Sequence, residues 1–203
     1  MISACLCNFP CRYDGKSKGD LRLVSLMKEG LGIPVCPEVL GGLAVPRTPA
    51  EIVPVGPGGA ALAGSWRLAS DGSSNSSQVA FLGSAELTSA GGMPAIRSVL
   101  RGAKVVTADG VDVTRQYIEG AWKALFIGLQ SGCSKAILKA RSPSCGLGQI
   151  YDGTYSGRLV QGHGVFAELL LAHGIEVYTE ENFTKLELGK RMPVMMNPTE
   201  ERR

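Results

Sequence analysis

Cysteine is the residue type in this sequence best suited to bind a metal or to take part in catalysis. The chain has six cysteines, Cys5, Cys7, Cys11, Cys36, Cys133 and Cys145. An even number allows a secreted disulfide framework. However, no basic segment followed by an apolar stretch opens the chain, and a chain of 203 residues is too long to need such cross-links. We therefore expect a cytoplasmic protein whose reduced thiols are available for a metal or for catalysis.

The cysteine spacing alone identifies no site. Cys5, Cys7 and Cys11 lie close together, but their spacing matches neither a zinc motif nor a ferredoxin motif. A different pattern appears when the cysteines are compared with the predicted strands. Three of them come at or just after the end of a strand: Cys5, Cys36 and Cys145.

In an open parallel sheet the carboxyl ends of the strands share one edge, and ligands bind in the crevice at that edge. The three thiols would therefore converge. Three convergent thiolates without a fourth partner suit an iron–sulfur group that leaves one metal atom open. Ordinary buried cysteines, packed as small hydrophobic side chains, remain the alternative.

The hydrophobic pattern predicts strands that alternate with helices. Helices are expected over 21–29, 115–130 and 164–173, with Thr114 as an N-cap and Tyr117 among the apolar helix positions. The expected strands are 1–6, 33–35, 136–138 and 175–179, and a hairpin is expected from 104–107 and 111–113. This alternation is typical of an α/β fold: a three-layer, mostly parallel, Rossmann-like sheet with helices on both faces.

Composition narrows the class of protein. With 44% hydrophobic and 19% charged residues, the chain supports a buried core. We expect a single domain over 1–203 that carries a Gly/Ser-rich insertion at about 57–101. No apolar stretch approaches the ~20 residues of a membrane span. A net charge of +3 from scattered basic residues argues against a nucleic-acid partner. The sequence does not indicate an oligomeric state.

Six sequence blocks, in order, resemble the domain-of-unknown-function family 523, which includes the thiouracil desulfidases. They are Ser3-Ala-Cys-Leu6, Arg12-Tyr-Asp-Gly15, Cys36-Pro-Glu-Val-Leu-Gly-Gly42, Asp112-Val-Thr114, Lys139-Ala-Arg-Ser-Pro-Ser-Cys-Gly146 and Tyr151-Asp-Gly-Thr-Tyr-Ser-Gly157. The resemblance covers 1–56 and about 102–180, and the segment between them departs from the usual family pattern.

The resemblance implies a 4Fe–4S cluster held by Cys5, Cys36 and Cys145, with the fourth iron free of protein ligands. It also implies hydrolytic removal of sulfur from a thiolated pyrimidine or a related small thio-compound, with no net redox change. We expect Cys7 and Cys11 not to be ligands, and Cys133 to serve packing.

Attack of water on the ring carbon requires groups that move protons. The nearest acidic candidate is Glu38, two residues after Cys36, unless it only caps backbone amides. Ser142 and Ser144, beside Cys145, are placed to hydrogen-bond the cluster or the substrate, or else to cap a turn. Ser134 is a weaker catalytic candidate. Two other functions stay open: a non-catalytic cluster-binding sensor or accessory module, and a zinc-dependent hydrolase with three protein ligands and a water.

Overall fold

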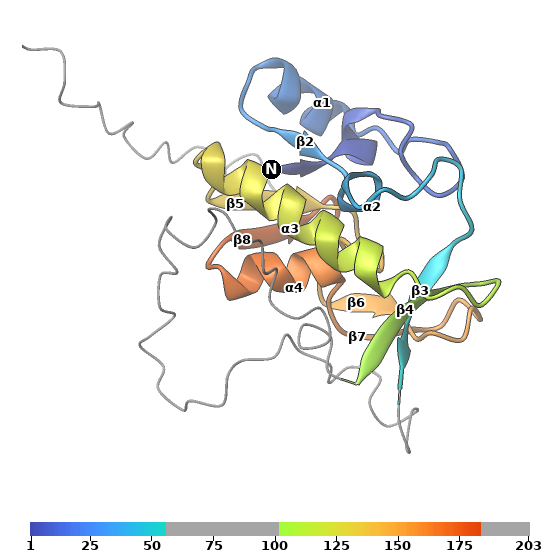
Figure 1. Cartoon of the computed structure of the whole chain (residues 1–203). Coiled ribbons are helices and arrows are strands. Elements are labelled where there is room, and N and C mark those ends of the chain that lie inside the picture. Colours follow the sequence, from blue (N-terminus) through green and yellow to red (C-terminus); the bar gives the residue numbers. More distant parts are fainter. Residues whose placement is uncertain (56–101, 184–203) are drawn as a thin grey trace, which may run out of the picture.

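The protein is described by a computed structural model covering residues 1–55 and 102–183. The insertion predicted at about 57–101 lies outside the described residues. The centre of the fold is a four-stranded parallel sheet with the order β2-β1-β5-β8 (Figure 1). Its strands are β1 (Ile2–Ser3), β2 (Pro34–Val35), β5 (Lys135–Leu138) and β8 (Glu176–Thr179).

Helices cover both faces of this sheet, because alternate side chains of its strands point to opposite sides. Ile2 and Ile137 pack with helix α1 (Leu21–Lys28). Ala136 and Leu138 pack with helices α3 (Thr114–Gln130) and α4 (Val165–Ala172). In Figure 1 the sheet lies between α1 and the α3–α4 pair. The predicted three-layer α/β fold is therefore confirmed.

The first strand is shorter than predicted. It ends at Ser3, and the chain continues as a one-turn 3-10 helix, η1 (Ala4–Cys7), which Asn8 closes in a left-handed conformation with a φ of 74°. All four residues of η1 are buried. The apolar pattern over 1–6 therefore indicates that these residues are buried, and not that they form one continuous strand.

Two small antiparallel sheets flank the carboxyl edge of the main sheet. One pairs β3 (Ala50–Pro54) with β4 (Ala103–Thr107), and the other pairs β6 (Gln149–Tyr151) with β7 (Leu159–Gln161). The predicted hairpin is reduced to a single bridge between Val106 and Asp112, because β4 takes β3 as its main partner.

Thr114 opens α3 but is not its N-cap. Its hydroxyl accepts a hydrogen bond from the Val105 amide at 2.9 Å and donates one to Asp112 Oδ1 at 2.6 Å. Thr114 therefore attaches the start of α3 to strand β4. The N-cap position falls on Val113, whose side chain makes no capping bond.

A close contact between two helices sets the position of the segment after Cys36. The short helix α2 (Pro37–Leu40) packs directly on α3. A Cβ atom added to Gly120 of α3 would lie 1.8 Å from the Pro37 carbonyl oxygen, so only glycine allows this approach. The contact places Glu38 of α2 beside Tyr117 of α3.

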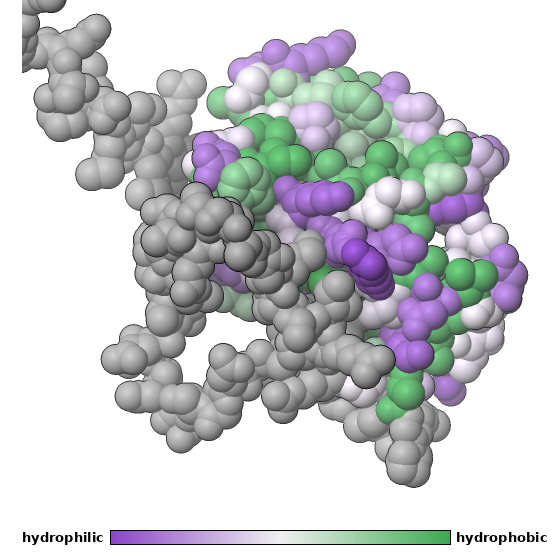
Figure 2. Space-filling model, viewed as in Figure 1, coloured by the Kyte–Doolittle hydropathy of each residue, from purple (hydrophilic) through white to green (hydrophobic). Residues whose placement is uncertain are grey.

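The visible surface mixes hydrophilic and hydrophobic residues (Figure 2). Within 1–55 and 102–183, no helix is both long and apolar enough to cross a membrane.

Candidate active site

Cysteines from three strands gather at the carboxyl edge of the parallel sheet. Cys5 lies in η1 directly after β1, Cys36 directly follows β2, and Cys145 lies in the loop after β5. Cys5 and Cys145 are buried, and Cys36 is half-buried. Charge on Cys36 is close enough to act on the pKa of Cys145. The topology therefore brings the three predicted thiols to one edge.

A fourth thiol, Cys11, lies among them. Its thiol lies close enough to those of Cys5 and Cys36 to affect its pKa, and the Cys36 thiol faces the Cys11 carbonyl oxygen at 3.9 Å. The contact with Cys36 acts to lower the pKa of Cys11, but the contact with Cys5 and burial raise it to about 11. No spacing signal indicates this proximity, which arises from the turn after η1.

The remaining two cysteines lie elsewhere. Cys7 is buried beneath α1, with its thiol 3.9 Å from the Leu23 carbonyl oxygen, and burial raises its pKa to about 11. Cys133 precedes β5, at the amino ends of the strands, and packs against the core.

The Cys145 loop is held by hydrogen bonds of its own serines. Ser142 Oγ accepts the amide hydrogens of Ser144 at 3.2 Å and of Cys145 at 3.1 Å. Ser142 therefore caps the turn, one of the two roles considered for it, while its hydroxyl hydrogen remains able to donate. Burial raises the pKa of the Cys145 thiol to about 12, although contacts with Ser3 and Ser144 act in the other direction.

The hydroxyl of Ser144 is buried without a hydrogen-bond partner among the described residues. The residue is fully buried, and within the described part of the chain its Oγ makes no hydrogen bond of acceptable geometry, although it lies near the Cys145 thiol. Burying an unsatisfied polar group costs about 1–3 kcal/mol. An orphaned hydroxyl beside a thiol is therefore a reason to expect a polar or sulfur-containing group at this point.

Glu38 is held in a buried ion pair rather than capping a turn. Arg47 donates to Glu38 Oε2 from Nε at 3.0 Å and from Nη2 at 2.5 Å. Only 14% of the Glu38 side chain and 10% of the Arg47 side chain are exposed. Arg47 also donates to the carbonyl oxygens of Ala44 and Cys11, each at 3.1 Å. One guanidinium therefore joins the carboxylate to the segment that carries the fourth thiol.

Tyr117 lies near this ion pair. It is 2% exposed, and its hydroxyl is close enough to the Glu38 carboxylate for the two groups to affect each other's charge. Burial raises the pKa of Tyr117 well above its ordinary value, and the negative charge of Glu38 raises it further. Tyr117 therefore stays a neutral donor. For Arg47, burial is the largest single effect and acts to lower the pKa, but the charge and hydrogen bond of Glu38, with smaller contributions from Tyr117 and Cys36, together raise the pKa.

Arg47 and Tyr117 were both missed by sequence reasoning. Tyr117 fits the apolar face of its helix, so periodicity identifies it only as a core residue. Arg47 lies in a loop without a motif.

Ser134 is not brought to this edge. It is exposed, it precedes β5, and its carbonyl oxygen accepts the Glu176 amide hydrogen at the amino end of β8. Because all four strands are parallel, the amino and carboxyl edges lie on opposite sides of the sheet. Ser134 therefore lies at the edge of the sheet opposite the gathered cysteines, and its predicted catalytic role gains no support from this placement.

The arrangement bears on the zinc alternative. Among the described residues, no three His, Cys, Asp or Glu side chains come together in a way that would hold a metal ion. In an iron–sulfur cluster each cysteine ligates a different iron, so the sulfur atoms need not surround a single point.

A buried ion pair secures the start of the Cys145 loop and makes stability dependent on pH. Glu180, just after β8, pairs with Lys139 Nζ at 2.8 Å and accepts the Ala140 amide hydrogen at 2.7 Å. Burial acts to raise the pKa of Glu180, but these partners outweigh it and lower the pKa. The stabilisation is therefore complete above the unfolded pKa of about 4.3 and is lost as the pH falls through the lower folded value.

We expect Glu180→Gln to reduce the free energy of unfolding by about 1–2 kcal/mol at pH 7, since it removes a charge-assisted hydrogen bond. The difference from the wild type should shrink below about pH 4. Urea titrations across this pH range measure it. Glu181→Gln is the matched control, because Glu181 pairs with Arg141 at an exposed site and should change stability by less than about 0.5 kcal/mol. An equal loss at pH 7 and pH 3 would contradict the account.

Known proteins resemble this chain in sequence and in fold. The model of the 2-thiouracil desulfurase family matches residues 1–89 and 84–182. The uncharacterized protein YbbK of Bacillus subtilis (strain 168) is 35% identical over 187 residues, which cover 92% of this chain and 98% of YbbK. The solved structure of the [4Fe-4S]-dependent thiouracil desulfidase TudS is similar with a TM-score of 0.64 and 35% identity, covering 92% of this chain and 93% of that one. This chain therefore belongs to the 2-thiouracil desulfurase family of enzymes, as the sequence blocks had indicated.

Proposed function

We propose that this protein is an iron–sulfur-dependent desulfidase that hydrolytically removes sulfur from a thiolated pyrimidine such as 2-thiouracil. The single observation that carries the proposal is the gathering of cysteines from β1, β2 and β5 at one sheet edge, beside a buried carboxylate. The 35% identity to a [4Fe-4S]-dependent thiouracil desulfidase supports it. All six cysteines are free thiols, which suits a reducing compartment such as the cytoplasm.

The residues at this edge fit a 4Fe–4S cluster. Thiolates are the ligands that iron–sulfur clusters take in proteins, and Cys5, Cys36 and Cys145 would hold it. The orphaned Ser144 hydroxyl is a hydrogen-bond donor for a sulfide or thiolate there. When bound, a cluster with one iron free of protein ligands supplies a soft Lewis acid for the thiocarbonyl sulfur.

Glu38 is the residue that would take the proton from the attacking water. Its carboxylate is fixed by Arg47. A fixed orientation lowers the cost of reaching the reactive geometry. The guanidinium that holds Glu38 also donates to the Cys11 carbonyl oxygen, which the Cys36 thiol faces at 3.9 Å, so the proposed base lies near the proposed ligands. Ser142 acts by holding the Cys145 loop in shape.

Two measurements on one sample test the proposal. Protein purified without oxygen should be brown, and the reconstituted protein should release free sulfide from 2-thiouracil and form uracil without an added reductant. A colourless protein loaded with zinc would exclude the cluster. A brown protein that binds 2-thiouracil without releasing sulfide would instead indicate a sensor.

A further inference from the structure

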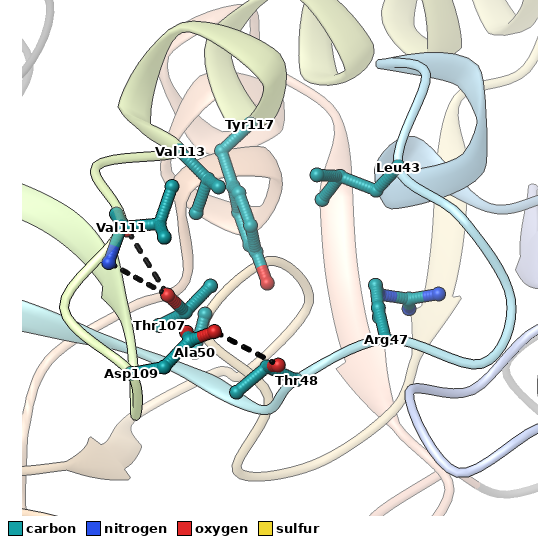
Figure 3. Close-up of a pocket in the computed structure, with 9 residues that line it drawn as sticks. All are labelled: Leu43, Arg47, Thr48, Ala50, Thr107, Asp109, Val111, Val113 and Tyr117. Carbon is teal, nitrogen blue, oxygen red and sulfur yellow. Dashed lines mark hydrogen bonds between the residues drawn. The ribbon is translucent and has the colours of Figure 1, made fainter.

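A small cavity lies next to the Glu38–Arg47 ion pair and has no role yet assigned to it. It measures ≈ 210 Å³. Figure 3 shows the Tyr117 ring extending from α3 into its middle, with the hydroxyl at the inner end. Its apolar wall is formed by Leu43, Ala50, Val111 and Val113.

The cavity adjoins the cysteines through two shared side chains. Arg47 and Tyr117 line it, and Arg47 also donates to the Glu38 carboxylate at 3.0 Å. Arg47 also donates to the Cys11 carbonyl oxygen at 3.1 Å, and the Cys36 thiol faces the same oxygen at 3.9 Å, so the cysteines lie nearby. A molecule in the cavity would therefore have one end close to the carboxylate and the thiols.

The walls of the cavity suit a flat ring with polar edges. Its volume is below the ~300–1,000 Å³ of pockets that bury drug-sized ligands, so it matches a single substituted ring. The aliphatic wall and the Tyr117 ring offer apolar faces. Thr48 and Asp109 add polar atoms, and the hydrogen bond between them is long, at 3.5 Å. The Asp109 carboxylate is therefore available to accept a ring N–H.

We propose that this cavity is the subsite for the pyrimidine ring of the substrate, with the ring held among Tyr117, Val113 and Ala50 and its sulfur-bearing edge directed toward Glu38 and the cysteines. The inference rests on the proposed function, and it adds where the free base binds. It predicts that the sulfur-free product, uracil, binds the protein by the same contacts.

The test uses reconstituted enzyme and two variants whose larger side chains reduce the volume of the cavity. Val111→Trp fills the cavity at an exposed position, and Ala50→Leu fills it from strand β3. Each should raise the KM for 2-thiouracil and the Kd for uracil, measured by calorimetry, by about tenfold or more, while kcat changes less. Val55→Trp is the matched control: this exposed valine does not line the cavity and should leave both constants unchanged.

Two results separate this inference from the proposed function. If 2-thiouracil releases sulfide but both variants keep wild-type KM and Kd values, the subsite is wrong and the function stands. If no sulfide is released but uracil binds the wild type and binds both variants more weakly, the function is wrong and the subsite stands. A wild-type protein that does not bind uracil also overturns the subsite.

Discussion

Replacing Cys145 by alanine is expected to abolish both the brown colour and sulfide release. Cys145 is buried at the sheet edge, and a four-iron cluster that leaves one iron open needs three protein ligands. The loss of one of these three cysteine ligands should prevent the cluster from assembling at all. Visible absorption, iron content and sulfide release from 2-thiouracil, measured on anaerobically reconstituted protein, should all fall to background. Cys5→Ala and Cys36→Ala should behave alike.

Cys133→Ala is the control for this prediction. Cys133 lies at the opposite end of β5 and packs against the core, so iron content and turnover should stay near wild type. Full iron content in Cys145→Ala, or its loss in Cys133→Ala, would contradict the assignment of ligands.

Replacing Glu38 by glutamine is expected to lower kcat by about 10²–10⁴-fold, the usual contribution of general acid–base catalysis. Glutamine keeps the size of the side chain and an oxygen for Arg47 but cannot take a proton. Iron content and the visible spectrum should stay unchanged, because Glu38 is not proposed as a ligand. Steady-state rates of sulfide release, normalised to bound iron, measure the effect.

Glu29→Gln is the control for this prediction. Glu29 is an exposed residue at the end of α1, and its carboxylate accepts a hydrogen bond from the Ser25 hydroxyl. Its rate should equal the wild-type rate. A Glu38→Gln protein that loses iron in proportion to activity would show that Glu38 stabilises the fold or the cluster rather than moving a proton.

Much of the fold could be predicted because it depends on local patterns. The apolar spacing of 21–29 and 164–173 identifies α1 and α4 to within a residue or two at each end, since both helices bury one face against the sheet. Strands β3, β6 and β7 were missed. They are short, and the pairing of β3 with β4 joins segments that a long intervening stretch separates.

The site was predictable only where topology determines it. The rule that parallel strands share a carboxyl edge placed Cys5, Cys36 and Cys145 together, because each follows a strand directly or within its loop. The same rule, applied to Ser134, would have excluded it, since Ser134 precedes its strand.

Arg47 and Tyr117 were beyond this reasoning. They meet Glu38 through the packing of α2 on α3, which depends on the absence of a side chain at Gly120. A tertiary contact of this kind leaves no periodic signal in the sequence.

An iron anomalous-scattering map from a crystal of the anaerobically reconstituted protein would locate the metal and its ligands. We expect one four-iron cluster at the carboxyl edge of the sheet, with Sγ atoms of Cys5, Cys36 and Cys145 each on a different iron and no protein atom on the fourth. A peak ligated by Cys7 or Cys133, or a single metal ion in place of the cluster, would contradict it.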